Sequence, residues 1–346
     1  MRYFVTSSKD ASIYSDFQNQ NTGIDAILDL FKYKTSEIDK HSRILIEFDY
    51  TQVSQSLSNG TITNPTFSLD LTTTRFKELA SEFVLVTHPV SQSWNMGLGK
   101  RQDNPKTTTG VSYTYRDYLS GSAWTTNGGD FNDGYSSTQT FGTTTDNISF
   151  DVTDIVDAHI SGTIPNYGFI VKFSGSYETD TDNYGEINSF SSETNTIYRP
   201  KLTVQWDDSS IVTGSLSEVT DEDSFVTVKN LQKEYKVDKK YKFRLHVREQ
   251  FPTLTYSTGS VYSTVGFLPT GSSYSIVDNV TGDIIVPFDE NSTLSVDSNG
   301  NYFNQDFKGW EAERFYRILF QINDGTDLFQ IIDDGFVFKL AEWWHK

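Results

Sequence analysis

The chain has 346 residues and no cysteine, which excludes disulfides and thiolate metal sites. Its 28 Lys and Arg residues face 46 Asp and Glu residues, a net charge of −18. That balance argues against a nucleic-acid or anionic-membrane partner, because phosphate groups attract basic patches. Aromatic residues make up 14% of the chain, and together with many Thr and Val residues they favour β-sheets.

No stretch has the apolar length that a membrane span needs, and residues 1–6 lack the basic segment and apolar run of a secretory signal. We therefore expect synthesis in a cytoplasm. Alternation of apolar and polar residues predicts strands in the first part of the chain. These segments are 3–5, 12–14, 42–50, 67–71, 83–88, 139–141 and 148–150. Segment 26–33 fits a helix or a strand, and its periodicity does not decide between them.

Segment 91–146 is long, polar and rich in Gly, Thr and Asn, and most of it is expected to be loop. It carries four large aromatic residues, Trp94, Tyr113, Tyr115 and Trp124. Their rings offer a surface for stacking on a sugar. The alternative is that they hold the loop against its own sandwich or against a neighbouring chain, since aromatic residues are also enriched at interfaces.

The rest of the chain is organised around segment 150–173. Asp151 and Thr153 can cap a short helix whose apolar residues are Ile155, Val156 and Ile160. Gly162 ends that helix, and Pro165 prevents its return. A turn at 166–168 then leads into a strand at 169–173, so this segment predicts one helix closing a sheet edge.

Strands at 187–190 and 201–206 complete a first domain, residues 1–208. Residues 209–222 read as an acidic, polar linker to a second domain, residues 223–346. That domain has predicted strands at 241–247, 274–277, 283–288, 315–322, 328–332 and 336–340. Turns are predicted at Asn299-Gly300, Asp324-Gly325 and 333–335. The expected fold is all-β, a jelly-roll β-sandwich with one short helix followed by a smaller β-sandwich or meander.

Chemical motifs are sparse. The five His residues are scattered without metal-ligand spacing, and no nucleophile motif is present, so we expect no catalytic residues. Gly97-Leu98-Gly99-Lys100 resembles the end of a phosphate-binding loop, but Trp94 and Arg101 stand where that loop needs Gly and Ser or Thr. Glu178, Asp180 and Asp182 are weak calcium candidates that lack the Gly and terminal Glu of a calcium-binding loop. No other cofactor is expected.

Several separated segments, in order, resemble the DNRLRE-domain family, whose fold is a jelly-roll similar to carbohydrate-binding modules. They are 10–13, 21–23, 42–49, Trp94, 151–156 with Gly162 and 166–168, 190–193 and 199–204. Segment 88–100 looks like a variant found in virion structural proteins of tailed bacteriophages. Residues 316–335 are similar to the ends of those same proteins.

The resemblance implies a non-enzymatic virion component of the tail, neck or baseplate, assembled in the host cytoplasm. Its expected partners are other virion proteins and further copies of itself in a symmetric oligomer, without nucleic acid or membrane. Trp343 and Trp344 would then form a carboxyl-terminal assembly tail, since exposed paired Trp residues would otherwise be costly. The alternative is a glycan-binding adhesin module that contacts host surface polysaccharide. A hydrolase of surface glycans is a third hypothesis, for which the sequence names no carboxylate pair.

Overall fold

The computed structural model describes residues 1–36, 39–219, 224–251, 265–323 and 329–342. The chain divides into two compact units. The amino-terminal unit comprises Val5–Ile62 and Thr66–Val204. The carboxyl-terminal unit comprises Met1–Phe4, Thr63–Pro65 and Gln205–Lys346. Each unit is described by itself below.

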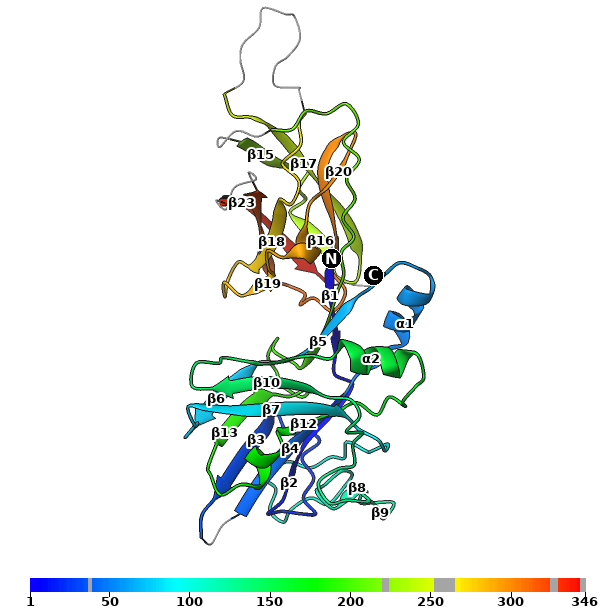
Figure 1. Ribbon diagram of the computed structural model, residues 1–346, viewed down its shortest axis with the longest axis vertical. Coiled ribbons are helices and arrows are strands. Elements are labelled where there is room, and N and C mark those ends of the chain that lie inside the picture. The colour runs from blue at the N-terminus through cyan, green and yellow to red at the C-terminus, as the bar shows by residue number, and fades with distance from the viewer. Residues whose placement is uncertain (37–38, 220–223, 252–264, 324–328, 343–346) are drawn as a thin grey trace, which may run out of the picture. The chain divides into compact units, whose positions relative to one another are not determined.

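The amino-terminal unit is built from curled antiparallel sheets (Figure 1). One sheet has the order β1-β14-β5-β11, and a larger one has the order β10-β7-β12-β4-β3-β13-β6, with β2 paired to β4. The bounds of the first six strands are β1 Arg2–Thr6, β2 Lys9–Tyr14, β3 Ile27–Lys34, β4 Asp39–Glu47, β5 Thr66–Leu71 and β6 Thr73–Lys77. The others are β7 Glu82–Pro89, β10 Ser137–Gly142, β11 Ile148–Asp151, β12 Phe169–Phe173, β13 Gly185–Phe190 and β14 Lys201–Gln205. The predicted all-β sandwich is confirmed, and segment 26–33, which periodicity left open, is strand β3.

Within the described ranges three short α-helices lie between the strands, where the sequence predicted one, and a 3-10 turn spans Glu290–Ser292. The α-helices are α1 Thr51–Ser58, α2 Thr153–Ile160 and α3 Ser176–Thr179. α1 is almost entirely polar and buries only Val53, so it carries little apolar periodicity. α3 is a single turn that begins after Gly175, in a segment that reads as an acidic loop.

The helix, turn and strand of this segment form as predicted, but Val152, which has no capping side chain, occupies the N-cap position of α2 in place of Asp151 or Thr153. The Asp151 carboxylate accepts hydrogen bonds from the Thr153 backbone N–H at 3.0 Å and from its hydroxyl at 2.7 Å. These bonds satisfy polar groups at the start of α2. Gly162 ends the helix in a left-handed conformation, with φ of +74°, that a side chain would disfavour. Strand β12 is buried along its whole length, between β4 and β7.

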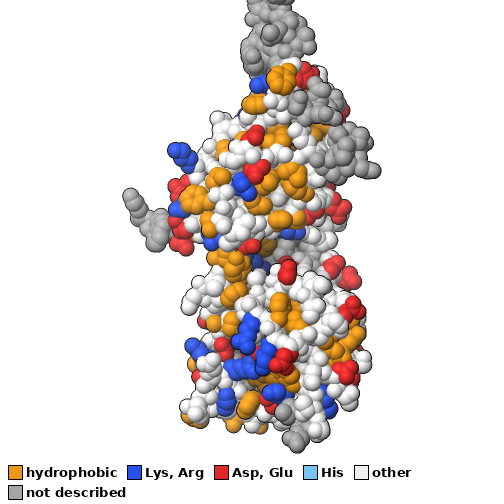
Figure 2. Space-filling view, turned by 90° about the vertical axis from the view of Figure 1, so that its left-hand side faces the viewer, with side chains coloured by type: hydrophobic (Ala, Val, Ile, Leu, Met, Phe, Trp, Pro, Cys, Tyr) orange, Lys and Arg blue, Asp and Glu red, His pale blue; other side chains and the backbone are white. Residues whose placement is uncertain are grey.

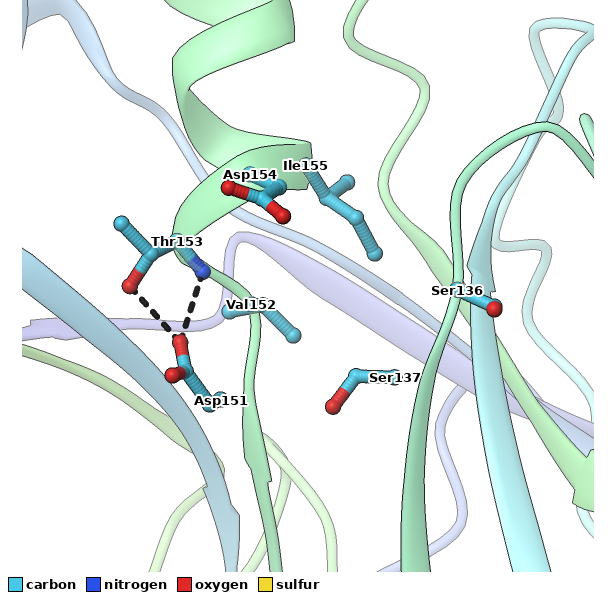
Figure 3. Close-up of a pocket in the computed structure, with 7 residues that line it drawn as sticks. All are labelled: Ser136, Ser137, Asp151, Val152, Thr153, Asp154 and Ile155. Carbon is cyan, nitrogen blue, oxygen red and sulfur yellow. Dashed lines mark hydrogen bonds between the residues drawn. The ribbon is translucent and has the colours of Figure 1, made fainter.

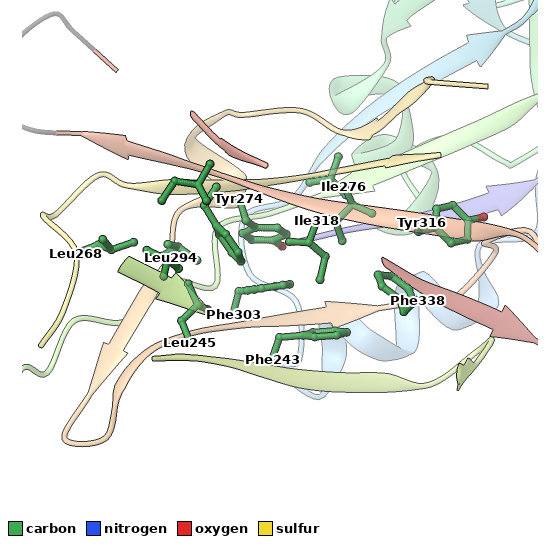
Figure 4. Packing of buried hydrophobic residues seen from close by; sticks show 14 of the residues in the cluster. Phe243, Leu245, Leu268, Tyr274, Ile276, Leu294, Phe303, Tyr316, Ile318 and Phe338 are labelled. Carbon is green, nitrogen blue, oxygen red and sulfur yellow. The ribbon is translucent and has the colours of Figure 1, made fainter. Parts of the chain in front are cut away.

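The carboxyl-terminal unit is also a pair of sheets, ordered β15-β17-β21-β20 and β16-β23-β22-β18-β19. Its strands are β15 Ser224–Lys229, β16 Glu234–Lys236, β17 Lys240–Glu249, β18 Ser273–Asp278, β19 Ile284–Val286, β20 Ser295–Asp297, β21 Gly300–Asp306, β22 Phe315–Asn323 and β23 Phe329–Ala341. Phe243 of β17 stacks on Phe303 of β21, and residues of β18, β22 and β23 pack over them (Figure 4). Alternate residues of each strand thus enclose one core.

Two segments of the carboxyl-terminal half differ from their sequence-based predictions. The described part of the proposed linker, 209–219, runs along this unit, because Ile211 and Glu218 form β-bridges with Val296 and Phe267. Residues 220–222 lie outside the described residues. The turn predicted at 333–335 is instead an irregularity inside one continuous strand, β23, where the pairing with β22 shifts between Ile318 and Phe320.

Candidate functional site

The two tryptophans of the predicted sugar platform are buried. Trp94 and Trp124 leave only 5% and 4% of their surface accessible and belong to a core cluster with Leu45 and Ile170. Their indole N–H groups donate to the backbone oxygens of Tyr167 and Ser112, at 2.9 and 3.0 Å. Neither ring can offer a face to a sugar, so the platform prediction is wrong for both. Apolar burial, with a backbone partner for each N–H group, outweighs exposure here.

The two tyrosines of the same prediction are half-buried and do not join into one platform. Tyr113 packs on the Trp94–Trp124 cluster, and its hydroxyl lies 2.9 Å from Nε2 of His41. Tyr115 belongs to a two-stranded ribbon of β8 Tyr115–Asp117 and β9 Ser122–Ala123, where its ring meets the edge of Tyr118. Tyr113 therefore holds the loop to the sandwich, the alternative stated above, whereas Tyr115 packs within the loop itself.

The glycine motif at 97–99 is a close-packing device rather than a phosphate loop. A Cβ on Gly97 would lie 1.8 Å from the Thr109 carbonyl oxygen, and one on Gly99 would lie 2.4 Å from the carbonyl oxygen of Asn21. Asn21 is fully buried and donates to the backbone oxygens of Met96 and Val111, at 2.7 and 2.8 Å. Its side-chain oxygen accepts the Gly99 N–H at 2.8 Å. One amide therefore fixes three points of the long loop.

A second anchor of the loop is Arg101. Its guanidinium lies 2.7 Å from the carboxylate of Asp29, and its carbon lies 5.3 Å from the centre of the Tyr14 ring. Asp29 also accepts hydrogen bonds from the Tyr14 hydroxyl and from Asn188, at 2.7 and 2.6 Å. Burial raises the pKa of Asp29, while Arg101 acts in the opposite direction. The arrangement joins the loop to β3 and β13.

The weak calcium candidates do not form a site. The Glu178 carboxylate is buried and accepts hydrogen bonds from Arg43 at 2.8 and 2.9 Å and from Lys172 at 2.8 Å. Burial favours the protonated form, but these two cations hold the pKa of Glu178 below its usual value. The Asp180 carboxylate instead accepts hydrogen bonds from the Tyr184 hydroxyl and from the backbone N–H of Asp182. Among the described residues no group of His, Asp and Glu is placed to hold a metal ion.

The proposed assembly tail, Trp343 and Trp344, lies outside the described residues.

Apolar side chains do reach the surface of both units (Figure 2). On the long loop, Leu98 and Leu119 expose 70% and 72% of their surface, and Tyr118 is partly exposed beside Leu119. We call Leu98, Tyr118 and Leu119 the loop apolar patch. Its parts are tied together, since the Leu98 N–H donates to the Thr109 hydroxyl and the Tyr118 N–H donates to the Gly110 oxygen.

A small cavity of about 200 Å³ opens at the start of α2 (Figure 3). Its lining residues are Ser136, Ser137 and 151–155. Asp151 and Asp154 stand at the helix start where an anion would otherwise bind, and the Asp151 carboxylate already caps Thr153. The cavity therefore does not fit an anionic ligand.

The outer face of β17 carries a row of basic residues. Lys240, Lys242, Arg244 and Arg248 alternate with buried residues, and Lys229 of β15 pairs with Arg244. We call these five residues the β17 basic face. Asp297 accepts two hydrogen bonds from Arg244, at 2.8 and 2.6 Å, and these hold the pKa of Asp297 well below its usual range.

The β17 basic face was missed in the sequence analysis, although the sequence carries its signal. Segment 229–248 holds two acids, Glu234 and Asp238. In a chain of net charge −18, the same segment holds eight basic residues, Lys229, Lys233, Lys236, Lys239, Lys240, Lys242, Arg244 and Arg248. The net charge of the whole chain is a sum over all residues, and it hides a local run of opposite sign.

The face is accompanied by a groove of about 320 Å³, where β15 ends and the edge of β17 is left open. Its lining includes Asn230, Gln232, Tyr235 and Tyr241, with Lys229, Lys242, Phe243 and Arg244. The tyrosine hydroxyls accept hydrogen bonds from the backbone N–H groups of Gln232 and Lys236, at 3.0 and 3.1 Å. The tyrosines therefore support the wall of the groove.

Comparison with known proteins gives no further identification. No protein-family model matches the chain, and no curated protein matches its sequence. Over the residues that the structure describes, no helix is both long enough and apolar enough to cross a membrane.

Proposed function

We propose that the chain is a non-enzymatic structural component of a tailed-bacteriophage virion that acts by protein–protein assembly in the tail, neck or baseplate. The virion setting rests on the sequence resemblance given above. The assembly role is supported by the loop apolar patch, in which Leu98 and Leu119 are about seven-tenths exposed. Apolar residues gathered on one exposed loop are typical of contact surfaces.

The way in which the loop is held strengthens the proposal. Asn21 and Arg101 fix the backbone on either side of Leu98, and Trp94 and Trp124 anchor the loop in the sandwich. A surface that is already ordered loses little conformational entropy on binding, which favours its use as a fixed docking element. The glycan-binding alternative loses its predicted platform, because both tryptophans are buried.

Immunogold electron microscopy of source virions tests the proposal. Gold on intact particles, at the head, neck or tail, is the expected result. Absence of gold would overturn the proposal, provided that the antibody binds the purified folded chain and that the protein is present in infected cells.

A double variant tests whether the loop apolar patch is the surface through which the chain assembles. Leu98→Asp combined with Leu119→Asp should reduce incorporation into particles while leaving the thermal unfolding midpoint nearly unchanged, because both side chains are exposed. Thr74→Asp with Thr144→Asp, two exposed substitutions that add the same charge elsewhere in the unit, provides the control. Equal incorporation of the apolar-patch variant and the control would count against this patch as the assembly surface.

A further inference from the structure

Charge is segregated along this chain in a way that its net value hides. Segment 117–171 contains no Lys or Arg. The same segment contains seven acids, Asp117, Asp130, Asp133, Asp146, Asp151, Asp154 and Asp157. Segment 229–248 has the opposite composition, with eight basic residues against two acids. One block lies in the amino-terminal unit and the other in the carboxyl-terminal unit.

Both blocks present their charges to solvent. Asp151, Asp154 and Asp157 are exposed, at and just before α2, whereas Ile155 and Val156 are buried beneath them. We call these three residues the α2 acidic face. No Lys or Arg nitrogen of the described residues lies within ion-pair distance of Asp154 or Asp157. Burial and the neighbouring Asp154 charge raise the pKa of Asp157, a direction that a bound cation would reverse.

On the β17 basic face, two lysines are placed to bind carboxylates of a partner. Lys229 and Lys240 are exposed, and no carboxylate of the described part of the chain lies within ion-pair distance of either, although Lys240 stands opposite Asp306 of β21 and its charge acts to lower the pKa of that carboxylate. Lys242 and Arg244 are already engaged by Asp297, at 3.3 and 2.6 Å. Alternate residues of a strand lie roughly 7 Å apart, so the face presents a row of cations. An opposing row of carboxylates along a helix, where positions three apart share a face, complements that row.

We infer that the β17 basic face docks on the α2 acidic face of a second copy of this chain. The two faces belong to different surfaces of the protein, so the contact is heterologous and joins copies head to tail. Such contacts build rings when the rotation closes and filaments when it does not. The inference rests on the proposed assembly role and names the partner of that assembly.

A nucleic acid is the competing occupant of a basic face, and the geometry favours it less. Lys242 lies 3.4 Å from the centre of the Tyr302 ring, and the Arg248 guanidinium lies 4.2 Å from that of Phe225. The aromatic rings of this face are therefore covered by cations and do not offer bases a stacking surface.

The test uses the purified full chain in analytical ultracentrifugation. Wild-type protein should associate with rising concentration at about 0.1 M salt and dissociate at about 1 M, where the screening length falls from about 10 Å to about 3 Å. Lys229→Glu with Lys240→Glu, or Asp154→Lys with Asp157→Lys, should weaken this association by at least about tenfold. Lys77→Glu with Lys100→Glu makes the same change in charge elsewhere and should leave it unchanged.

Mixing the two charge-reversed variants in equal amounts tests whether the β17 basic face binds the α2 acidic face. Each retains the face that the other has lost, so association should return in the mixture, provided that circular dichroism shows both variants folded. A monomeric wild type, or a mixture of folded variants that stays monomeric, would overturn the inference. So would binding of a single-stranded oligonucleotide that is lost in the Lys229/Lys240 variant and kept in the Asp154/Asp157 variant. If gold labels virions while the purified chain stays monomeric, the docking inference is refuted and the proposed function stands. Unlabelled virions refute the proposed function.

Discussion

Glu178 and Arg43 form a two-point ion pair inside the amino-terminal unit, with N–O distances of 2.8 and 2.9 Å. Lys172 approaches the same carboxylate from β12, at 2.8 Å. Arg43 also donates to the Gly128 backbone oxygen at 2.8 Å, so the pair joins α3, β4, β12 and the long loop. One buried carboxylate thus balances two cations that the strands bring inward.

Replacement of Glu178 by Gln should be strongly destabilising. The change leaves two buried cations without their counter-charge, and we expect the free energy of unfolding to fall by about 3–5 kcal/mol. Urea unfolding at pH 7 measures this. Glu193→Gln, at an exposed position of the same unit, should change it by less than about 0.5 kcal/mol. Similar values for the two variants would show that the buried network contributes no more than a surface charge.

His159 gives the unit a defined pH response. The ring is buried between Tyr50 and Phe169, and burial lowers its pKa to about 4 from 6.5. The folded protein therefore binds fewer protons here than the unfolded chain does. The stability that the neutral ring provides is present above pH 6.5 and is lost as the pH falls toward 4.

His159→Leu should remove this loss. Between pH 7 and about 4.5 the variant should gain roughly 2–3 kcal/mol relative to the wild type, measured from urea unfolding at both pH values. The wild type is compared with the His159→Leu variant, because Asp10 changes the stability of both proteins in the opposite direction as the pH falls. Burial raises the pKa of Asp10 to about 6, so its contribution grows as the pH falls from 6 toward 3.8. An equal pH response in wild type and variant would refute the assignment to His159.

Trp94→Ala and Trp124→Ala should act on stability. Each removes a large side chain from a packed cluster, and we expect losses of about 3–5 kcal/mol in the free energy of unfolding. Tyr118→Ala, at the loop surface, should cost less than about 1 kcal/mol. Differential scanning calorimetry separates these outcomes. An unchanged melting temperature after either Trp substitution would contradict the burial described for that residue.

Asn21→Ala should loosen the long loop. The substitution leaves the Met96 and Val111 oxygens and the Gly99 N–H without their side-chain partner, and should cost at least about 2 kcal/mol. Limited proteolysis should then cut within 95–110 faster than in the wild type. Asn195→Ala, which removes an exposed amide of the same unit, is the matched control. Equal cleavage rates in the two variants would argue against Asn21 as the anchor of the loop.

Alternation of apolar residues was sufficient to predict most strands, and the helical spacing of Ile155, Val156 and Ile160 was sufficient to predict α2. Strand β6 was missed because most of its residues are exposed and polar, and its pairing with β13 depends on the neighbouring strand. Helix α1 was missed because it buries only Val53. Strand β6 and helix α1 are therefore stabilised by contacts with neighbouring elements, and their own sequences show little apolar periodicity.

The candidate sites were harder to predict than the fold. A polar sequence around Trp94 and Trp124 suggested exposure, yet the chain folds back so that both rings join a core formed by distant strands. Glu178 belongs to an acidic run, and only the fold reveals that Arg43, from β4, lies beside it. The β17 basic face, in contrast, could have been found from its local run of charge.

The first four residues belong to the carboxyl-terminal unit. Met1 and Arg2 hydrogen-bond to Trp206 and Gln305, which lie 205 and 303 residues further along the chain. During synthesis these two residues leave the ribosome well before Trp206 and Gln305 do. Residues 5–204 can therefore begin to fold before the partners of Met1 and Arg2 have been made. The carboxyl-terminal unit depends on contacts between residues 205 and 303 positions apart, and such long-range closure is expected to slow its folding.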